Sequence, residues 1–122
     1  MSGFDNAGLP YPEKVDAQTL TTAAFAIAAP KTAGTIKKYT MTGTPASVTG
    51  PPAVAGLSFD IWWLMGGAGS YTFPWPAAFR WFGASSAGTA PSFPTAAGSV
   101  FMTTHVCVDG THWESAYIGE TV

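Results

Sequence analysis

The sequence predicts an all-β protein, with one antiparallel β-sandwich or jelly-roll-like domain behind an extended N-terminal arm. Short stretches of alternating apolar residues are typical of strands, and 14 glycines and 10 prolines interrupt the 122-residue chain at frequent intervals. No stretch has the length and periodicity of a normal helix. A chain of this size forms one domain, so we expect an arm over residues 1–18 and a single domain over residues 19–122.

The composition indicates a surface that other protein chains cover. Charged residues make up only 10% of the chain and hydrophobic residues 47%, against roughly 25% charged residues in an average soluble domain. An uncharged surface suits a homo-oligomer. The net charge of −2 offers no basic patch for nucleic acid. The most apolar segment, residues 57–67, is too short to span a bilayer, so we expect neither a nucleic-acid nor a membrane partner.

The N-terminal part contains the arm and an ambiguous segment. Residues 1–18 hold Gly, Asn and two prolines without apolar periodicity, so we expect an arm that only contacts with another chain would order. Residues 19–29 (TLTTAAFAIAA) have enough alanine for a short helix. The alternation of Phe25 and Ile27, closed by Pro30, favours a strand.

Two central strands follow. In residues 34–42 (GTIKKYTMT), the side chains alternate between two faces, which predicts a strand with one solvated face. One face carries Lys37, Tyr39 and Met41, and the other carries Ile36, Lys38 and Thr40. Residues 57–65 (LSFDIWWLM) form the most hydrophobic strand. We expect further strands at Val48, at residues 70–73 and around residues 78–82. One face of the 57–65 strand carries Leu57, Phe59, Ile61 and Trp63.

A terminal hairpin spans residues 99–119, because Asp109-Gly110 favours a two-residue type I′ turn. In that register Val106 faces Trp113 and Met102 faces Tyr117 on the core side. The predicted core therefore consists of Phe59, Ile61, Trp63, Trp81, Met102, Val106, Trp113 and Tyr117.

The same register places Cys107 opposite His112 and His105 opposite Glu114. These four side chains would suit zinc, but the pairing depends on the turn type, and the favoured alternative is a His105–Glu114 charge pair beside a semi-buried thiol. Cys107 with a histidine and Asp109 also has the residue types of a cysteine nucleophile. A hairpin offers neither a cleft nor an oxyanion hole for such chemistry. We therefore expect no catalytic residue, metal or cofactor, and no enzyme.

The other acidic and glycine-rich positions give no clear chemistry. The seven acidic residues are scattered, which disfavours the facing carboxylates of a glycosidase. Asp60 lies alone in an apolar segment, and we expect it to be hydrogen-bonded to a loop or a neighbouring subunit. The glycines of residues 66–69 precede a predicted strand and not a helix, unlike a phosphate-binding loop.

Aromatic residues are dense between positions 62 and 82. Most should lie in the core, but aromatic rings also anchor subunit interfaces and stack on sugars. The candidates for an interface or a glycan-stacking platform are Trp62, Trp75, Phe79 and Trp81.

Several turn and packing motifs occur in order: FPWP at residues 73–76, FRW at 79–81, GTAPSF at 88–93, VDGTHW at 108–113 and AYIG at 116–119. Over residues 57–119 this order resembles a small β-domain of bacteriophage tail and other virion structural proteins. The resemblance implies a non-enzymatic virion component in a tail, tail fibre or capsid decoration, with other virion proteins as partners. The alternative is a receptor-binding or glycan-binding module that recognises a host-surface glycan through exposed tryptophans.

Overall fold

The structure is a computed structural model that describes residues 15–83 and 89–120. It confirms the all-β prediction, because the described elements are eight strands and one helix of a single turn. Within these residues no helix is long and apolar enough to cross a membrane. The elements are β1 (Val15–Leu20), β2 (Phe25–Ala26), α1 (Pro30–Ala33), β3 (Ile36–Met41), β4 (Val48–Thr49), β5 (Ser58–Met65), β6 (Phe79–Trp81), β7 (Val100–Cys107) and β8 (Trp113–Glu120).

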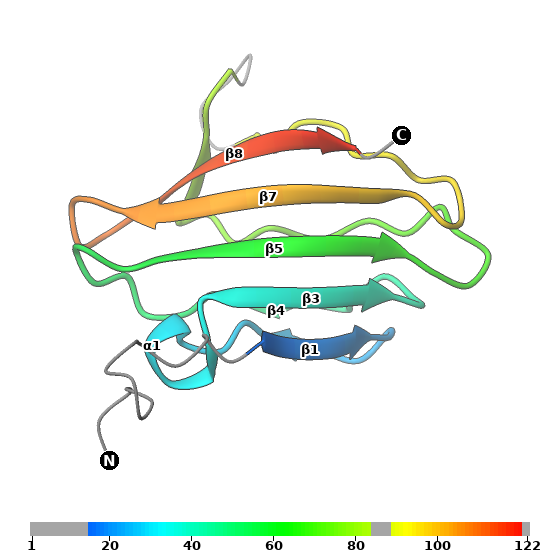
Figure 1. Cartoon of the computed structure of the whole chain (residues 1–122), viewed down its shortest axis with the longest axis horizontal. Helices are drawn as coiled ribbons and strands as arrows, with labels where there is room; N and C mark the ends of the chain where they lie inside the picture. Colours follow the sequence, from blue (N-terminus) through cyan, green and yellow to red (C-terminus); the bar gives the residue numbers. More distant parts are fainter. Residues whose placement is uncertain (1–14, 84–88, 121–122) are drawn as a thin grey trace, which may run out of the picture.

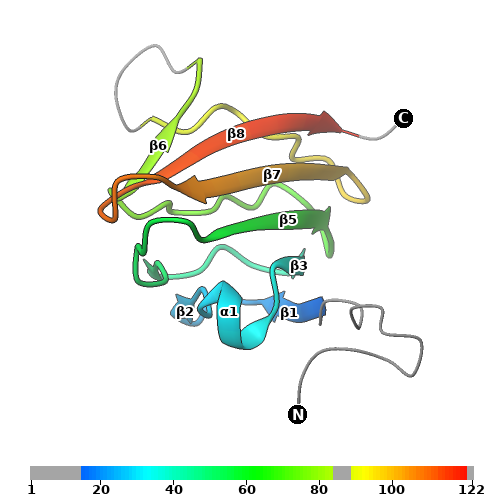
Figure 2. The same ribbon diagram turned by 60° about the vertical axis from the view of Figure 1, so that its left-hand side comes forward.

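Six strands form one mixed sheet in the order β1-β3-β5-β7-β8-β6. Figure 1 shows this order from β1 to β8, and Figure 2 shows β6 next to β8. β5, β7 and β8 pair antiparallel as predicted. The prediction of a wholly antiparallel sheet is wrong for β1-β3-β5 and for β6-β8, which are parallel. Parallel neighbours need a crossover connection, and the segments between β1 and β3 and between β3 and β5 supply it.

Those crossovers form part of a second layer that covers one face of the sheet. Figure 2 shows β2 and α1 of this layer beside β1. β2 and β4 lie within the crossovers and pair with each other as a small parallel sheet. The ring of Phe25 on β2 packs edge-on against Tyr39 on β3, with centroids 5.1 Å apart. The strand interpretation of residues 19–29 thus holds for residues 19–20, which end β1, and for β2. Pro30 begins α1 in the first helical turn, where proline is tolerated.

The core lies between the sheet and this layer, which irregular segments from residues 66–78 and 89–98 complete. The expected strand at residues 70–73 is one of these irregular segments. Tyr117 packs partly buried against the core, as predicted, whereas Met102 is only half-buried and Val106 is exposed. The core prediction is correct for Phe59, Ile61, Trp63, Trp81 and Trp113, which are buried.

The hairpin register explains the two errors. Cys107 pairs with Trp113 and Val106 with Glu114, so the loop is longer than the expected two residues. The Asp109 carboxylate accepts the backbone N–H groups of Thr111 and His112, each at 2.8 Å, and this draws both residues into the turn. A shift of one residue moves every side chain of a strand to the opposite face.

The boundary of the arm also changes. Residues 15–18 belong to β1, an edge strand of the main sheet, so the domain includes them. β1 turns Asp16 and Leu20 inward. Its sequence, VDAQTL, shows no apolar alternation, because an acidic side chain occupies a core position. The remainder of the expected arm, residues 1–14, lies outside the described residues.

Candidate interaction surface

The outer face of the main sheet carries apolar side chains on five of its six strands, with threonine, serine and charged residues between them. It points away from the second layer, and none of its described side chains on β1, β3, β5, β7 and β8 is buried. Val15 is 49% exposed, Ile36 46% and Ile118 60%. We call this surface the open face. Its large apolar side chains are Val15, Ile36, Trp62, Leu64, Val100, Met102, Val106 and Ile118.

Trp62 lies near the middle of the open face. It sits on β5 beside Lys38 of β3 and Met102 of β7. The Lys38 Nζ lies 5.4 Å from the centroid of the Trp62 ring, a cation–π contact. Together with Val15 and Ile36, these three side chains line a shallow hollow of about 320 Å³. Trp62 is thus a half-buried ring in a mostly apolar depression. Aromatic residues in such surroundings often serve as the anchors of protein interfaces.

Polar groups on the open face satisfy one another. The Thr104 hydroxyl donates a 2.6 Å hydrogen bond to Asp60. Within the chain, the partner of Asp60 is therefore a residue of the adjacent strand and not the expected loop, while the expected contact with a neighbouring subunit stays a prediction. Asp60 and Lys38 are oppositely charged and lie on adjacent strands, which leaves the face with both signs of charge.

One end of the open face carries a charged cluster. The Arg80 Nε donates to Glu114 at 3.1 Å, a second guanidinium nitrogen also contacts Glu114, and Arg80 reaches Asp109 at 3.3 Å. The hydrogen bond to Glu114 raises the pKa of Arg80. The His112 hydrogen bond and the two backbone N–H groups hold the pKa of Asp109 well below its usual range. This exposed cluster braces the hairpin turn against β6.

The other three candidate aromatics lie away from the open face. Phe79 is completely buried and Trp81 is 7% exposed, so both belong to the core and offer no surface platform. Trp75 is partly buried, and its ring lies 4.6 Å from Phe73, 5.0 Å from Phe79 and 4.8 Å from Trp81 between centroids. A small sandwich fills its interior with large rings, and these three serve that purpose.

His105 lies inside this aromatic cluster. Its Nε2 is 2.9 Å from the Thr103 hydroxyl and its Nδ1 is 2.6 Å from the Ser115 hydroxyl. The Trp63 indole N–H donates to the same Thr103 oxygen at 2.9 Å. Burial lowers the pKa of His105 to about 3, so the ring is neutral at pH 7. His105 and Ser115 are completely buried, and a substrate has no access to this pair.

The four-ligand patch that a two-residue turn would allow does not form. His105 and Cys107 point into the core, whereas His112 and Glu114 lie on the solvent side of the hairpin. The longer turn separates the pairs, and it also removes the alternative His105–Glu114 charge pair, since His105 is opposite Ser115. Among the described residues no group of three or more His, Cys, Asp or Glu side chains could hold a metal ion.

A buried ion pair was not expected. The Lys37 Nζ lies 3.0 Å from Asp16, with the lysine completely buried and the aspartate 7% exposed. Gln18 donates a further hydrogen bond of 2.9 Å to Asp16. The available signal was the alternation in β3, which puts Lys37 on the same face as Tyr39 and Met41. Because that face of β3 is buried, the Lys37 ammonium group is buried as well. A buried charge is costly without a partner, so a carboxylate is required beside it.

No family model, no curated protein and no solved structure matches this chain. On the open face, the half-buried Trp62 and the surrounding aliphatic side chains form a surface without charge repulsion. The charged cluster around Arg80 holds the hairpin turn to β6, and His105 joins neighbouring strands inside the core, so both have a role in the fold.

Proposed function

We propose that the protein is a non-enzymatic structural component of a bacteriophage-like virion, and that it works by self-association through the open face. The observation that carries the proposal is the exposed apolar surface around Trp62. Monomeric soluble proteins rarely expose a large contiguous apolar patch, and such patches mark protein interaction sites. The motif order in residues 57–119 supports the virion setting, with a place in a tail, a tail fibre or a capsid decoration.

The open face is large enough for a stable interface. Five adjacent strands about 4.8 Å apart, with a rise of about 3.3 Å per residue, give a surface of roughly 20 Å by 25 Å. This is about 500 Å² in projection, and side-chain relief brings it near the ~800 Å² that each partner buries in a standard interface. Two such faces would pack like the two sheets of a sandwich, about 10 Å apart.

A second copy of this chain fits the charges on the face. A twofold interface places the same surface on both sides, so each contact occurs twice. The opposite charges of Lys38 and Asp60 on adjacent strands allow such a copy to place lysine against aspartate in both directions. Trp62 would be the central anchor, and the surrounding aliphatic side chains would exclude water.

Sedimentation of the purified chain tests self-association. We expect a dimer or a larger species, and we expect Trp62→Ser to weaken it at least about 30-fold, since a buried aromatic anchor contributes about 2 kcal/mol or more. The matched control is Val54→Ser, which removes a 52% exposed apolar side chain in the loop before β5, outside the strands of the open face, and should leave association unchanged. A monomer at high concentration, or equal association of both variants, would contradict this interface.

The virion setting needs its own test. Antibody labelling of purified phage particles that carry the gene for this chain should show the protein at a repeated position on the particle. If the chain is produced in infected cells but is absent from purified particles, the virion proposal fails even if the chain self-associates.

The second candidate function is a glycan-binding module, and the partial exposure of the Trp62 ring is the observation that favours it. A sugar would need the face of that ring, which the Lys38 ammonium group overlies at 5.4 Å. This arrangement favours a protein partner over a sugar. A stable monomer that binds glycans, and loses the binding in Trp62→Ser, would support the glycan function instead.

A further inference from the structure

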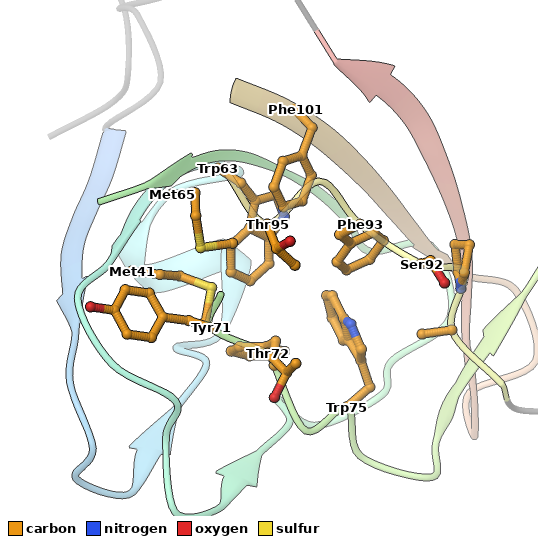
Figure 3. A pocket seen from close by; sticks show the side chains of 13 residues that line it. Met41, Trp63, Met65, Tyr71, Thr72, Trp75, Ser92, Phe93, Thr95 and Phe101 are labelled. Carbon is orange, nitrogen blue, oxygen red and sulfur yellow. The ribbon is translucent and has the colours of Figure 1, made fainter. Parts of the chain in front are cut away.

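An apolar cavity of about 150 Å³ lies between the sheet and the second layer (Figure 3). The sheet contributes Trp63 and Phe101, and the covering segments contribute Trp75 and Phe93. Figure 3 shows these rings around a central space, with methionine side chains at one end. The open face lies on the opposite side of the sheet, so this cavity is independent of the interface proposed above. Its remaining lining residues are Met41, Met65, Tyr71, Thr72, Phe73, Ala90, Pro91, Ser92 and Thr95.

The cavity has a few polar groups among its apolar walls. Thr72, Ser92 and Thr95 are the hydroxyl-bearing residues of the lining apart from Tyr71, and the rest of the wall consists of aromatic rings, small side chains and methionines. A mostly apolar lining with a small number of polar groups is characteristic of small-molecule sites.

Trp75 adds a specific signal. Its indole Nε1 is buried and has no hydrogen-bond partner among the described residues. The neighbouring Trp63, 5.8 Å away between ring centroids, has its own Nε1 satisfied by Thr103. A buried donor without a partner is costly and calls for an explanation such as a missing ligand. An acceptor brought into the cavity would supply the missing partner.

We propose that this cavity binds a small planar apolar molecule, with about one six-membered ring and one hydrogen-bond acceptor for the Trp75 indole N–H. The size supports the ring, because an apolar cavity of about 150 Å³ accepts one benzene molecule. The aromatic walls favour a flat ligand that makes stacked or edge-on contacts. The acceptor follows from the unsatisfied donor.

Two nearly isosteric probes test both parts of the proposal. Acetophenone carries a carbonyl acceptor, whereas cumene has a second methyl group in its place. We expect both to bind, acetophenone about fivefold more tightly because of the hydrogen bond. In Trp75→Phe, which keeps a ring but removes the donor, this preference should disappear. The wild-type chain has five tryptophans, and the indole N–H signal that disappears in Trp75→Phe is that of Trp75. Acetophenone should shift this signal in the NMR spectrum of the wild type.

A blocking variant locates the site. Thr72 is exposed and lines the cavity, so Thr72→Phe should fill it and reduce the binding of both probes at least tenfold. Thr111→Phe is the matched control, since Thr111 is exposed on the hairpin turn far from the lining residues, and it should bind as the wild type does. Three results would each overturn the proposal: neither probe binds, both bind equally to the wild type, or Thr72→Phe binds as well as the control.

Discussion

The imidazole Nδ1 of His105 lies 2.6 Å from the hydroxyl oxygen of Ser115 on the neighbouring strand, and both side chains are completely buried. The Ser115 hydroxyl donates to the Trp113 carbonyl at 3.2 Å, so its oxygen accepts the Nδ1–H. Nε2 then accepts from Thr103, whose oxygen accepts the Trp63 indole N–H. This one-directional chain joins β5, β7 and β8 and requires a neutral imidazole.

The first prediction concerns pH. Burial lowers the pKa of His105 to about 3, whereas an unfolded histidine titrates near 6.5. Below about pH 6.5 the unfolded state takes up a proton that the folded state refuses, so stability falls as the pH drops and continues to fall until about pH 3. Between pH 7 and pH 5 the free energy of unfolding should decrease by about 2 kcal/mol from this group, measured by urea denaturation at each pH.

Two variants isolate the histidine. His105→Gln keeps one acceptor and one donor, and it should lose this part of the pH dependence whatever its own stability. His112→Gln changes the partly exposed histidine of the hairpin turn and should keep the dependence. In the folded wild type, the NMR signals of the His105 ring should not titrate between pH 8 and pH 5. A ring that titrates normally would show that His105 is accessible to water.

A second prediction concerns the buried Lys37–Asp16 pair. Lys37→Met should reduce the free energy of unfolding by about 3–5 kcal/mol, because it leaves Asp16 charged and nearly buried without its cation. The double variant Lys37→Met/Asp16→Leu should regain most of this loss. Urea denaturation of the two single variants and the double variant gives the coupling free energy. Lys38→Met is the control on the opposite side of the same strand, and it should change stability by less than about 1 kcal/mol.

Parts of this fold follow from local pattern and parts do not. The alternation of β5 predicts correctly that Phe59, Ile61 and Trp63 face the core, because a period of two depends on the strand alone. The direction in which β1, β3 and β5 pair depends on crossovers that carry little pattern, and it was predicted wrongly. The same alternation in β5 puts Trp62 on the opposite face, but aromatic density alone gives no direction for a ring outside a clear strand pattern, so the burial of Trp75 and Phe79 could not be predicted.

The hairpin error has a more specific cause. Asp109-Gly110 is a strong turn signal, and a turn does form there, with Gly110 at a φ of 76°. The register, however, depends on the Asp109 side chain, which binds two backbone N–H groups and the His112 ring. Propensity describes backbone angles and omits these contacts. The favoured His105–Glu114 charge pair and the core positions of Met102 and Val106 were all derived from the register, so one error produced all three.

A third prediction tests that cause. Asp109→Ala removes the acceptor of the Thr111 and His112 backbone N–H groups, so both amide protons should exchange several-fold faster with solvent. Asp109→Asn keeps a side-chain oxygen and should retain most of the protection. Amide exchange measured by NMR checks both variants, with the amide of Cys107, which donates to the Leu57 carbonyl at 2.9 Å, as an internal reference. Equal exchange in Asp109→Ala and wild type would mean that another contact holds the turn.

The last prediction concerns the N-terminal boundary. Deletion of residues 1–14 leaves every described contact of the main sheet in place, so the fold should survive, and we expect any loss to appear in self-association. Deletion of residues 1–18 also removes Asp16 and Gln18, and it leaves the Lys37 ammonium group buried without a counter-charge. This longer deletion should reduce the free energy of unfolding by about 3 kcal/mol or more relative to the shorter one, measured by urea denaturation.

Lys37→Met serves as the control for this loss. Introduced into the longer deletion, it should recover part of the lost stability, because it removes the uncompensated charge, whereas in the shorter deletion it should destabilise the protein. Substitution effects of the same sign in both deletions would show that β1 contributes through packing and not through its carboxylate.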